Sequence, residues 1–276
     1  MTAALLKFDE IGYWSQLKLE IIEKYGSAYT TAFAKTKGLK KYYIDAFSGA
    51  GVHISKETGS QVEGSPTRAL KVSPPFDDYY FIDADQKKTD YLQKIYGSRN
   101  NVHIHNGDSN EYLTKKLLPK IQYKNFNRAL CLLDPYGLHL DWEVMFQAGQ
   151  SGAIDMFLNF PVMDMNRNTF WKNPDKVSQD NIKRMNRFWG DESWKDAAYA
   201  ENPQSNLFGT PDPIKQSNEQ IVEAFKNRLK QTAGFKYVPD PLPMRNSTNA
   251  VVYYLFLASQ KSVAQKIIND IFSKYR

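Results

Sequence analysis

Short apolar runs alternate with amphipathic segments along the first 160 residues of the chain. The runs predict five strands, of which two end at Asp45 and Asp83 and three span Val102–His105, Ala129–Leu133 and Ile154–Phe160. Strands and helices that alternate this regularly are typical of an α/β fold with a doubly wound, Rossmann-like parallel sheet. The continuous apolar run of the fourth strand favours a place in the middle of that sheet.

Helix signals lie before and between the predicted strands. Residues 14–36 have roughly helical spacing of apolar groups, which predicts one or two helices before the first strand. Residues 50–64 read as a polar loop, after which Ser65 suits a helix N-cap and Pro66 the first helical position. A further helix over Gln86–Tyr96 would be closed by Gly97.

The regular alternation breaks at Pro161. Residues 161–215 predict a mostly helical insertion after the fifth strand, and we treat it as a candidate substrate-recognition element. Order returns with Ser217 and Gln220, which form a capping box before a helix over Ile221–Lys230. Two closing strands are predicted at Phe235–Val238 and Val251–Ala258, so residues 1–160 and 216–276 would make one Rossmann-like domain around the insertion.

Acidic residues stand at four successive predicted strand ends, Asp45, Asp83, Asp108 and Asp134. The first is followed by a turn with Gly49 and Gly51, where the lack of a Cβ lets backbone N–H groups approach a ligand. Ligands of open α/β sheets bind at the carboxyl ends of the strands, so the four acids predict one crevice there. Each aspartate taken alone also suits a helix N-cap or a turn.

Composition narrows the class of protein. The chain has 276 residues, of which 42% are hydrophobic, enough for a substantial core. Its single cysteine, Cys131, rules out an intrachain disulfide, and its four histidines have no zinc-ligand spacing, so we expect no metal. Without an apolar signal core or a run of 18 apolar residues, we expect a soluble, cytoplasmic protein with no membrane partner.

Positive charge concentrates in one segment. The net charge is +6, and residues 165–188 hold six basic and two acidic residues. Lys183, Arg184 and Arg187 are the candidate substrate-binding residues, because clustered cations suit the phosphates of nucleic acid. The neighbouring aromatics suit two roles equally, a strand-binding surface or the core of a helical subdomain; they are Trp171, Phe188, Trp189 and Trp194.

The glycine turn argues against nucleotide cofactors that carry phosphates. A dinucleotide site needs a third glycine after Gly49 and Gly51, and Val52, His53 and Ile54 follow instead. No P-loop sequence is present either. S-adenosylmethionine fits better, since it has no phosphates and offers a ribose diol and an adenine amine to carboxylate acceptors.

An ordered set of short sequences resembles the class I methyltransferases and, more closely, the three-Cys-motif partner protein family. The set consists of Trp14–Glu20, Tyr43–Gly51, Gly64–Pro66, Phe81–Asp83, Gly107–Asn110, Asp134–Gly137 and Asn159–Phe160. The resemblance implies S-adenosylmethionine as cofactor and a neighbouring protein with three cysteines as partner. The cofactor-binding residues that it implies are Asp45, Phe47, Gly49, Gly51, Asp83, Asp108 and Ser109. Asp83 would bind the ribose diol, and Asp108 would meet the adenine.

The sequence Asp134-Pro135-Tyr136-Gly137 resembles the Asp-Pro-Pro-Tyr motif of adenine-N6 methyltransferases and the Asp-Pro-Phe-Gly form of guanine-N2 methyltransferases. The resemblance implies that Asp134, Pro135 and Tyr136 are catalytic. Asp134 and the Pro135 carbonyl would accept the hydrogens of an exocyclic amine, and Tyr136 would stack on the base. The same four residues also suit a simple β-turn.

Three functions therefore stand as hypotheses. The first is an S-adenosylmethionine-dependent methyltransferase that acts on adenine N6 or guanine N2 of DNA or RNA. The second is a catalytically idle, cofactor-binding subunit of a three-Cys-motif protein. The third is a methyltransferase for a protein or a small molecule.

Overall fold

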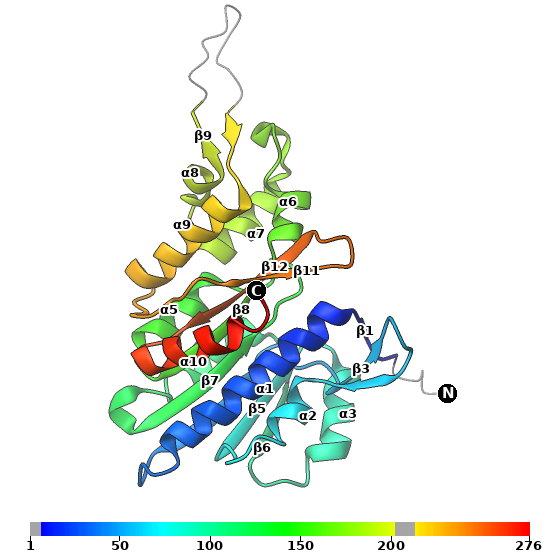
Figure 1. The fold of residues 1–276 in the computed structure, drawn as a ribbon, viewed down its shortest axis with the longest axis vertical. Coiled ribbons are helices and arrows are strands. Elements are labelled where there is room, and N and C mark those ends of the chain that lie inside the picture. Colours follow the sequence, from blue (N-terminus) through cyan, green and yellow to red (C-terminus); the bar gives the residue numbers. More distant parts are fainter. Residues whose placement is uncertain (1–6, 202–212) are drawn as a thin grey trace, which may run out of the picture.

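A computed structural model describes residues 7–201 and 213–276 of the chain. Its centre is a seven-stranded sheet in the order β11-β12-β8-β7-β2-β5-β6 (Figure 1). The strands span Lys40–Asp45 (β2), Asp78–Asp83 (β5), Val102–Asn106 (β6), Asn127–Leu133 (β7), Ile154–Phe160 (β8), Leu242–Arg245 (β11) and Val251–Ala258 (β12). β2, β5, β6, β7 and β8 run parallel, while β12 runs antiparallel to both β8 and β11. The predicted doubly wound α/β sheet is confirmed.

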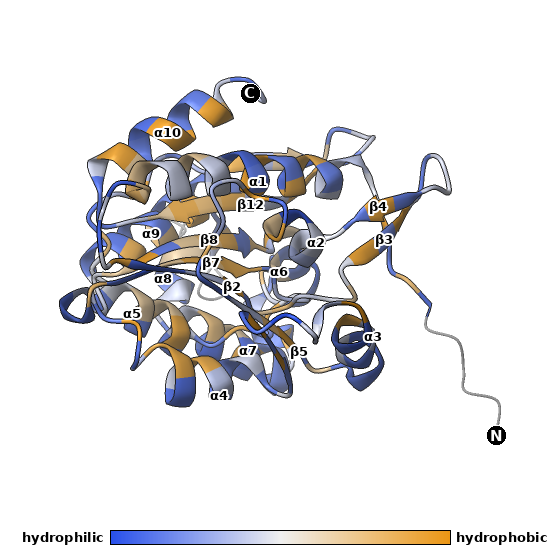
Figure 2. Ribbon diagram, turned by 90° about the horizontal axis from the view of Figure 1, so that it is seen from below, coloured by the Kyte–Doolittle hydropathy of each residue, from blue (hydrophilic) through white to orange (hydrophobic). Residues whose placement is uncertain are grey.

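Alternating side chains of the strands feed two hydrophobic cores, one on each face of the sheet. On β7, Leu130 and Leu132 enter one core, whereas Ala129, Cys131 and Leu133 enter the other. Successive side chains of a strand point to opposite faces, so a strand buried on both faces must be apolar throughout. Figure 2 shows the apolar strands enclosed between two helical layers.

Helices cover both faces of the sheet. The first core is packed by four helices, α1 (Tyr13–Phe33), α2 (Ser65–Ala69), α3 (Gln86–Tyr96) and α10 (Ser262–Phe272). The second core is packed by η1 (Leu113–Leu117), which continues α4 (Ser109–Tyr112), and by α5 (Trp142–Gln150), α7 (Gln179–Trp189), α8 (Trp194–Ala198) and α9 (Asn218–Gln231). The capping box predicted before α9 is present, with Ser217 and Gln220 bonded reciprocally.

The last part of the sheet differs from the prediction. Residues Phe235–Val238 form no strand, and only an isolated bridge joins Tyr237 to Ser259. The edge strand β11 lies instead between the two predicted closing strands, in a stretch that contains Pro239, Pro241 and Pro243. Pro243 is tolerated there because an edge strand has one side without a sheet partner, where a missing N–H costs no ladder hydrogen bond.

The stretch after the glycine turn is also more ordered than expected. Residues 50–64 contain a short hairpin, β3 (Val52–Ser55) and β4 (Gln61–Glu63), rather than a loop. β1 (Glu10–Ile11) pairs in parallel with β3, so tertiary contact with the N-terminal segment completes this small sheet. Ser65 is not an N-cap: Gly64 holds that place, and Ser65 is the first residue of α2.

The insertion is mostly helical, as predicted, and it shares the core of the sheet. It holds α6 (Val162–Asn168), the short η3 (Pro174–Lys176), α7, α8 and the strand pair β9 (Tyr199–Ala200) and β10 (Ile214–Lys215). Phe188, Trp189 and Trp194 are at most 2% exposed and belong to the same core as Phe160 of β8. These three aromatics are core residues, which excludes them from a strand-binding surface.

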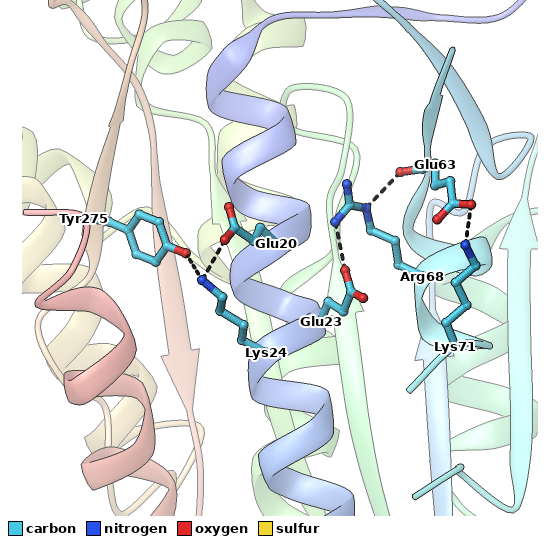
Figure 3. A network of polar contacts seen from close by, with 7 residues as sticks. All are labelled: Glu20, Glu23, Lys24, Glu63, Arg68, Lys71 and Tyr275. Carbon is cyan, nitrogen blue, oxygen red and sulfur yellow. Dashed lines mark hydrogen bonds and ion pairs between the residues drawn. The ribbon is translucent and has the colours of Figure 1, made fainter. Parts of the chain in front are cut away.

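Polar contacts on the outer side of α1 tie it to two other elements (Figure 3). Lys24 bonds Glu20 and the hydroxyl of Tyr275 behind α10 at 2.6 Å each. Arg68 of α2 bonds Glu23 of α1 at 2.8 Å. Each such exposed pair contributes little, about 0–1 kcal/mol. Together they connect the middle of α1 to α2 and to the segment after α10.

None of the helices in residues 7–201 and 213–276 is long and apolar enough to cross a membrane.

Candidate cofactor and substrate cavity

A cavity of about 500 Å³ opens at the carboxyl edge of the sheet, where the strand-end acids predict a crevice. Most of its wall comes from the N-terminal segment with the start of α1, the glycine turn after β2, the turn after β7, and the segment around the end of β8. Single residues of β3 and α2 and two residues of β12 complete it. The predicted site residues in its wall are Phe47, Gly49, Asp134, Pro135 and Tyr136. Its volume lies in the range that small-molecule sites occupy.

The glycine turn needs its glycines. Gly49 and Gly51 have φ angles of +62° and +73°, in the left-handed region that a side chain disfavours. A Cβ on Gly64 would lie 2.8 Å from the carbonyl carbon of Gly51, so the start of α2 packs directly on the turn. Phe47, Ser48 and Gly49 line the cavity, and their backbone N–H groups donate to Asp45, Ile82 and Asp83.

Asp45 lies behind the turn, fully buried, and does not line the cavity. Its Oδ1 accepts from the N–H of Phe47 at 3.3 Å, and its Oδ2 has no hydrogen-bond partner among the described residues. Burial raises the pKa of Asp45 to about 7, although Ser65 and the Phe47 N–H oppose the rise. Ser65 forms no hydrogen bond of good geometry to Asp45, so burial is the dominant cause of the raised pKa.

Asp83 also stabilises the glycine turn after β2. One carboxylate oxygen accepts from the N–H of Gly49 at 2.8 Å, and the other accepts from the N–H of Asp85 at 2.9 Å. The side chain is almost completely buried and lies outside the cavity wall. Contact of Asp83 with a ribose therefore stays a prediction, while its support of Gly49 is direct.

Asp108 and Ser109 hold the start of α4. Asp108 is the N-cap of that helix, where it accepts from the N–H groups of Asn110 and Glu111. The buried Ser109 hydroxyl donates to the carbonyl oxygen of Ala46, which joins the end of β6 to the end of β2. Neither residue lines the cavity. The alternative prediction that Asp108 is a helix N-cap is confirmed, and its contact with an adenine stays a prediction.

Asp134 is held in the cavity wall from two sides. Lys18 of α1, whose side chain is 7% exposed, forms an ion pair with Oδ2. Asn159, at the end of β8, donates to Oδ1 at 2.7 Å. A carboxylate has about four lone-pair sites, so each oxygen keeps capacity for a further donor. Lys18 and Asn159 stand in sequences that carry the family resemblance, but the sequence alone assigned no role to either.

Tyr136 lies at the mouth of the cavity and is 63% exposed. Its hydroxyl bonds Asp9 Oδ2 at 3.2 Å, and the ammonium of Lys88 lies 5.5 Å from the ring centroid. Lys88 and Asp9 form an ion pair of 2.6 Å. These contacts connect the N-terminal segment, α3 and the turn after β7. Tyr136 is thus accessible to an incoming ring.

The turn after β7 packs tightly on α6. Gly137 has a φ of +57°, and a Cβ there would lie 2.8 Å from Oδ2 of Asp164. That oxygen is buried and has no hydrogen-bond partner among the described residues. One helical turn further along α6, Arg167 also lines the cavity. The glycine is therefore required both by its conformation and by the approach of Asp164.

The cavity wall is acidic. It contains four carboxylates, of which Asp134 pairs with Lys18 and Asp9 with Lys88. Glu10 and Asp164 remain against the single basic side chain of Arg167. Burial, with help from the charge of Lys18, lowers the pKa of His53, so its ring is neutral at pH 7. An acidic wall favours a ligand that carries positive charge over one that carries phosphates.

The substrate-binding residues predicted on α7 lie away from this cavity. Lys183, Arg184 and Arg187 are absent from its wall. Arg187 pairs with Asp141, the N-cap of α5, at 2.7 Å, which gives it a structural contact. Whether the three residues bind a polymer outside the cavity stays a prediction.

The parallel strands, the antiparallel β12 inserted next to β8 and the cavity at the carboxyl edge define a doubly wound, Rossmann-like sheet. No family model matches the sequence, and no curated protein does. The assignment to the three-Cys-motif partner family is therefore not shown.

Solved structures of similar shape exist at low sequence identity. Protein LPL1258 from Legionella pneumophila is 11% identical, with a TM-score of 0.52 over 92% of this chain and 91% of that one. A putative methyltransferase from Thermobifida fusca has a TM-score of 0.41 at 11% identity, over 89% of this chain and 82% of that one. A dimethyladenosine transferase from Plasmodium falciparum has a TM-score of 0.36 at 12% identity, over 90% and 63%. The first likeness supports the fold alone, and the two lower scores carry no argument.

Proposed function

We propose that this protein is an S-adenosylmethionine-dependent methyltransferase that acts on an exocyclic amine of a nucleic-acid base, adenine N6 or guanine N2. The observation that carries the proposal is the position of Asp134. Its carboxylate lies in the wall of a cavity at the carboxyl edge of the sheet, where it pairs with a buried ammonium, and the same wall contains the accessible ring of Tyr136. The proposal combines this geometry with the resemblance of the Asp134–Gly137 sequence to amine methyltransferase motifs.

The cavity suits S-adenosylmethionine better than a nucleotide with phosphates. Bound there, this cofactor would supply a methyl group on a positively charged sulfur, and the acidic wall complements that charge. The residues that would hold it are Phe47 to Gly49, which line the cavity and carry no side chain at Gly49. Asp83 would act by fixing the N–H of Gly49, since it bonds that group directly.

Asp134 and the Pro135 carbonyl would orient the substrate amine. An exocyclic amine is a poor nucleophile because its lone pair is delocalised into the ring. Two acceptors on its hydrogens would localise that pair on nitrogen, and Asp134 would take the proton that the nitrogen loses. Lys18 and Asn159 keep the carboxylate in one orientation. Much of the rate would come from such positioning.

Tyr136 would stack on the target base. Its ring is 63% exposed at the cavity mouth, and aromatic stacking on a base is worth about 1–3 kcal/mol. For this, its contacts with Asp9 and Lys88 must give way or be shared with the base. The proposal covers both DNA and RNA as the polymer, with or without a three-Cys-motif protein as partner.

The test separates cofactor binding from transfer. Calorimetry should show binding of S-adenosylmethionine but not of NAD, and Asp83→Ala should weaken it. With radiolabelled cofactor and total cellular DNA or RNA, Asp134→Ala should lower transfer by roughly 100-fold or more while cofactor affinity changes only a few fold. Tyr136→Ala should lose activity, and Tyr136→Phe should lose much less.

Asp180→Ala serves as the matched control, because Asp180 is an exposed carboxylate on α7 outside the cavity. It should leave both binding and transfer unchanged. Absence of cofactor binding at millimolar concentration would refute the methyltransferase proposal. Binding without transfer to any nucleic acid would support the idle subunit or a different substrate class.

A further inference from the structure

Helix α6 contributes three residues to the cavity wall, Met163, Asp164 and Arg167. It begins directly after β8, and its inner turn places Asp164 against Gly137 in the cavity wall. Its last turn carries Arg167, which lines the cavity and is exposed. Among the described residues, the guanidinium of Arg167 has neither an ion-pair nor a hydrogen-bond partner. A free cation thus stands where a substrate would leave the cavity.

Trp171 lies next to Arg167 with its ring fixed. The indole N–H donates to the carbonyl oxygen of Arg167 at 2.8 Å, and the carbonyl oxygen of Trp171 accepts from the hydroxyl of Tyr199 at 2.9 Å. The ring is nevertheless 40% exposed, unlike the other tryptophans of the insertion, Trp189 and Trp194. An exposed indole whose polar atom is already bonded presents an apolar face that a base can cover at small entropic cost.

Lys172 extends this surface with a second exposed positive charge that has no ion-pair partner in the described part of the chain. Cations beside an exposed aromatic ring match the two features of a single strand, its phosphates and its unpaired base faces. Helix α7 offers a poorer match, because Arg187 is engaged by Asp141 and its aromatics are buried.

We propose that Arg167, Trp171 and Lys172 form a platform for single-stranded nucleic acid at the mouth of the cavity. Trp171 stacks on a base that flanks the target, while Arg167 and Lys172 bind neighbouring phosphates. The proposal rests on the nucleic-acid substrate of the proposed function and adds the path of the strand, along the end of α6. A duplex would hide its base faces from Trp171, so the platform selects unpaired nucleotides.

The test measures binding of a fluorescein-labelled, mixed-sequence 20-mer by anisotropy, with the cofactor omitted and with DNA and RNA in separate arms. Trp171→Ala should weaken binding by about fivefold or more, and Trp171→Phe should restore most of the affinity. Arg167→Gln should reduce the slope of log affinity against log salt by about 0.7. Lys266→Gln, an exposed lysine on α10, is the charge control and should leave the slope unchanged.

Binding by wild type that Trp171→Ala and Arg167→Gln leave unaltered would overturn the platform. So would tighter binding of a duplex than of either single strand, or no binding of any 20-mer at low salt. Cofactor titrations of wild type and Trp171→Ala run in parallel. If the wild type does not bind the cofactor, the methyltransferase proposal is refuted. The anisotropy experiment still tests the platform, because it is run without cofactor.

Discussion

Removing Asp134 should destabilise the protein through the charge it leaves behind on Lys18. The Lys18 side chain is 7% exposed and that of Asp134 is 28% exposed, so the ammonium loses its anion where water reaches it poorly. Breaking a buried pair from one side costs about 3–5 kcal/mol, and the partial exposure of Asp134 favours the lower end, about 3 kcal/mol. Lys18→Met should cost less, because the remaining carboxylate still has Asn159 and some water.

The loss should be visible as a lower melting temperature. An unfolding entropy of roughly 2.1 cal/mol/K per residue corresponds to about 0.6 kcal/mol/K for a chain of 276 residues, so 3 kcal/mol lowers Tm by about 5 °C. The assay is thermal and urea unfolding of Asp134→Ala, Lys18→Met and the double variant at pH 7. The double variant should be more stable than the sum of the single effects predicts, by about 1–3 kcal/mol.

Single effects below about 0.5 kcal/mol that add in the double variant would refute the reasoning, since the two groups would then be solvated independently. The same variants separate stability from catalysis. If Asp134 only stabilises the fold, the double variant should regain transfer as it regains stability. If Asp134 orients the amine, the double variant stays inactive although it is folded.

Two further predictions concern charge elsewhere. Because the pKa of Asp45 is raised from 3.8 to about 7 in the folded state, the stability it contributes is complete below about pH 4 and is lost as the pH rises through 7. Asp45→Asn should therefore flatten the decline of unfolding free energy between about pH 4 and 7, by up to about 4 kcal/mol, and an unchanged pH dependence would place the carboxyl in contact with water. Replacing Lys183, Arg184 and Arg187 with Gln should reduce the salt slope of nucleic-acid binding by about 0.7–0.9 per lost phosphate contact, with cofactor affinity unchanged; an unaltered slope would mean that these side chains form only a solvated face.

Several features of the fold could be predicted from short-range patterns. The span of β8, the helix Gln86–Tyr96 and the capping box at Ser217 depend on apolar runs and on cap residues within one turn. The continuous apolar run of β7 predicted a strand buried on both faces, and it lies in the middle of the sheet. Such signals are local, so one sequence is enough to detect them.

Features that depend on distant partners were missed or misassigned. The hairpin of β3 and β4 was expected to be a loop, because its third strand comes from the N-terminal segment more than forty residues away. β11 was missed because it contains proline, which argues against a strand inside a sheet. A sequence does not show that a strand will lie at the edge, where proline is tolerated.

The sequence by itself determined the sheet type, the crevice at its carboxyl edge and the presence of Asp134 there. The tertiary structure alone decided which acids face the cavity: Asp45 and Asp83 lie beneath the glycine turn, and Asp134 faces the opening. It also brought Lys18, 116 positions away, to the same carboxylate. The physical reason is that a strand end fixes where a side chain starts, whereas burial and ion pairing depend on which distant elements pack against it.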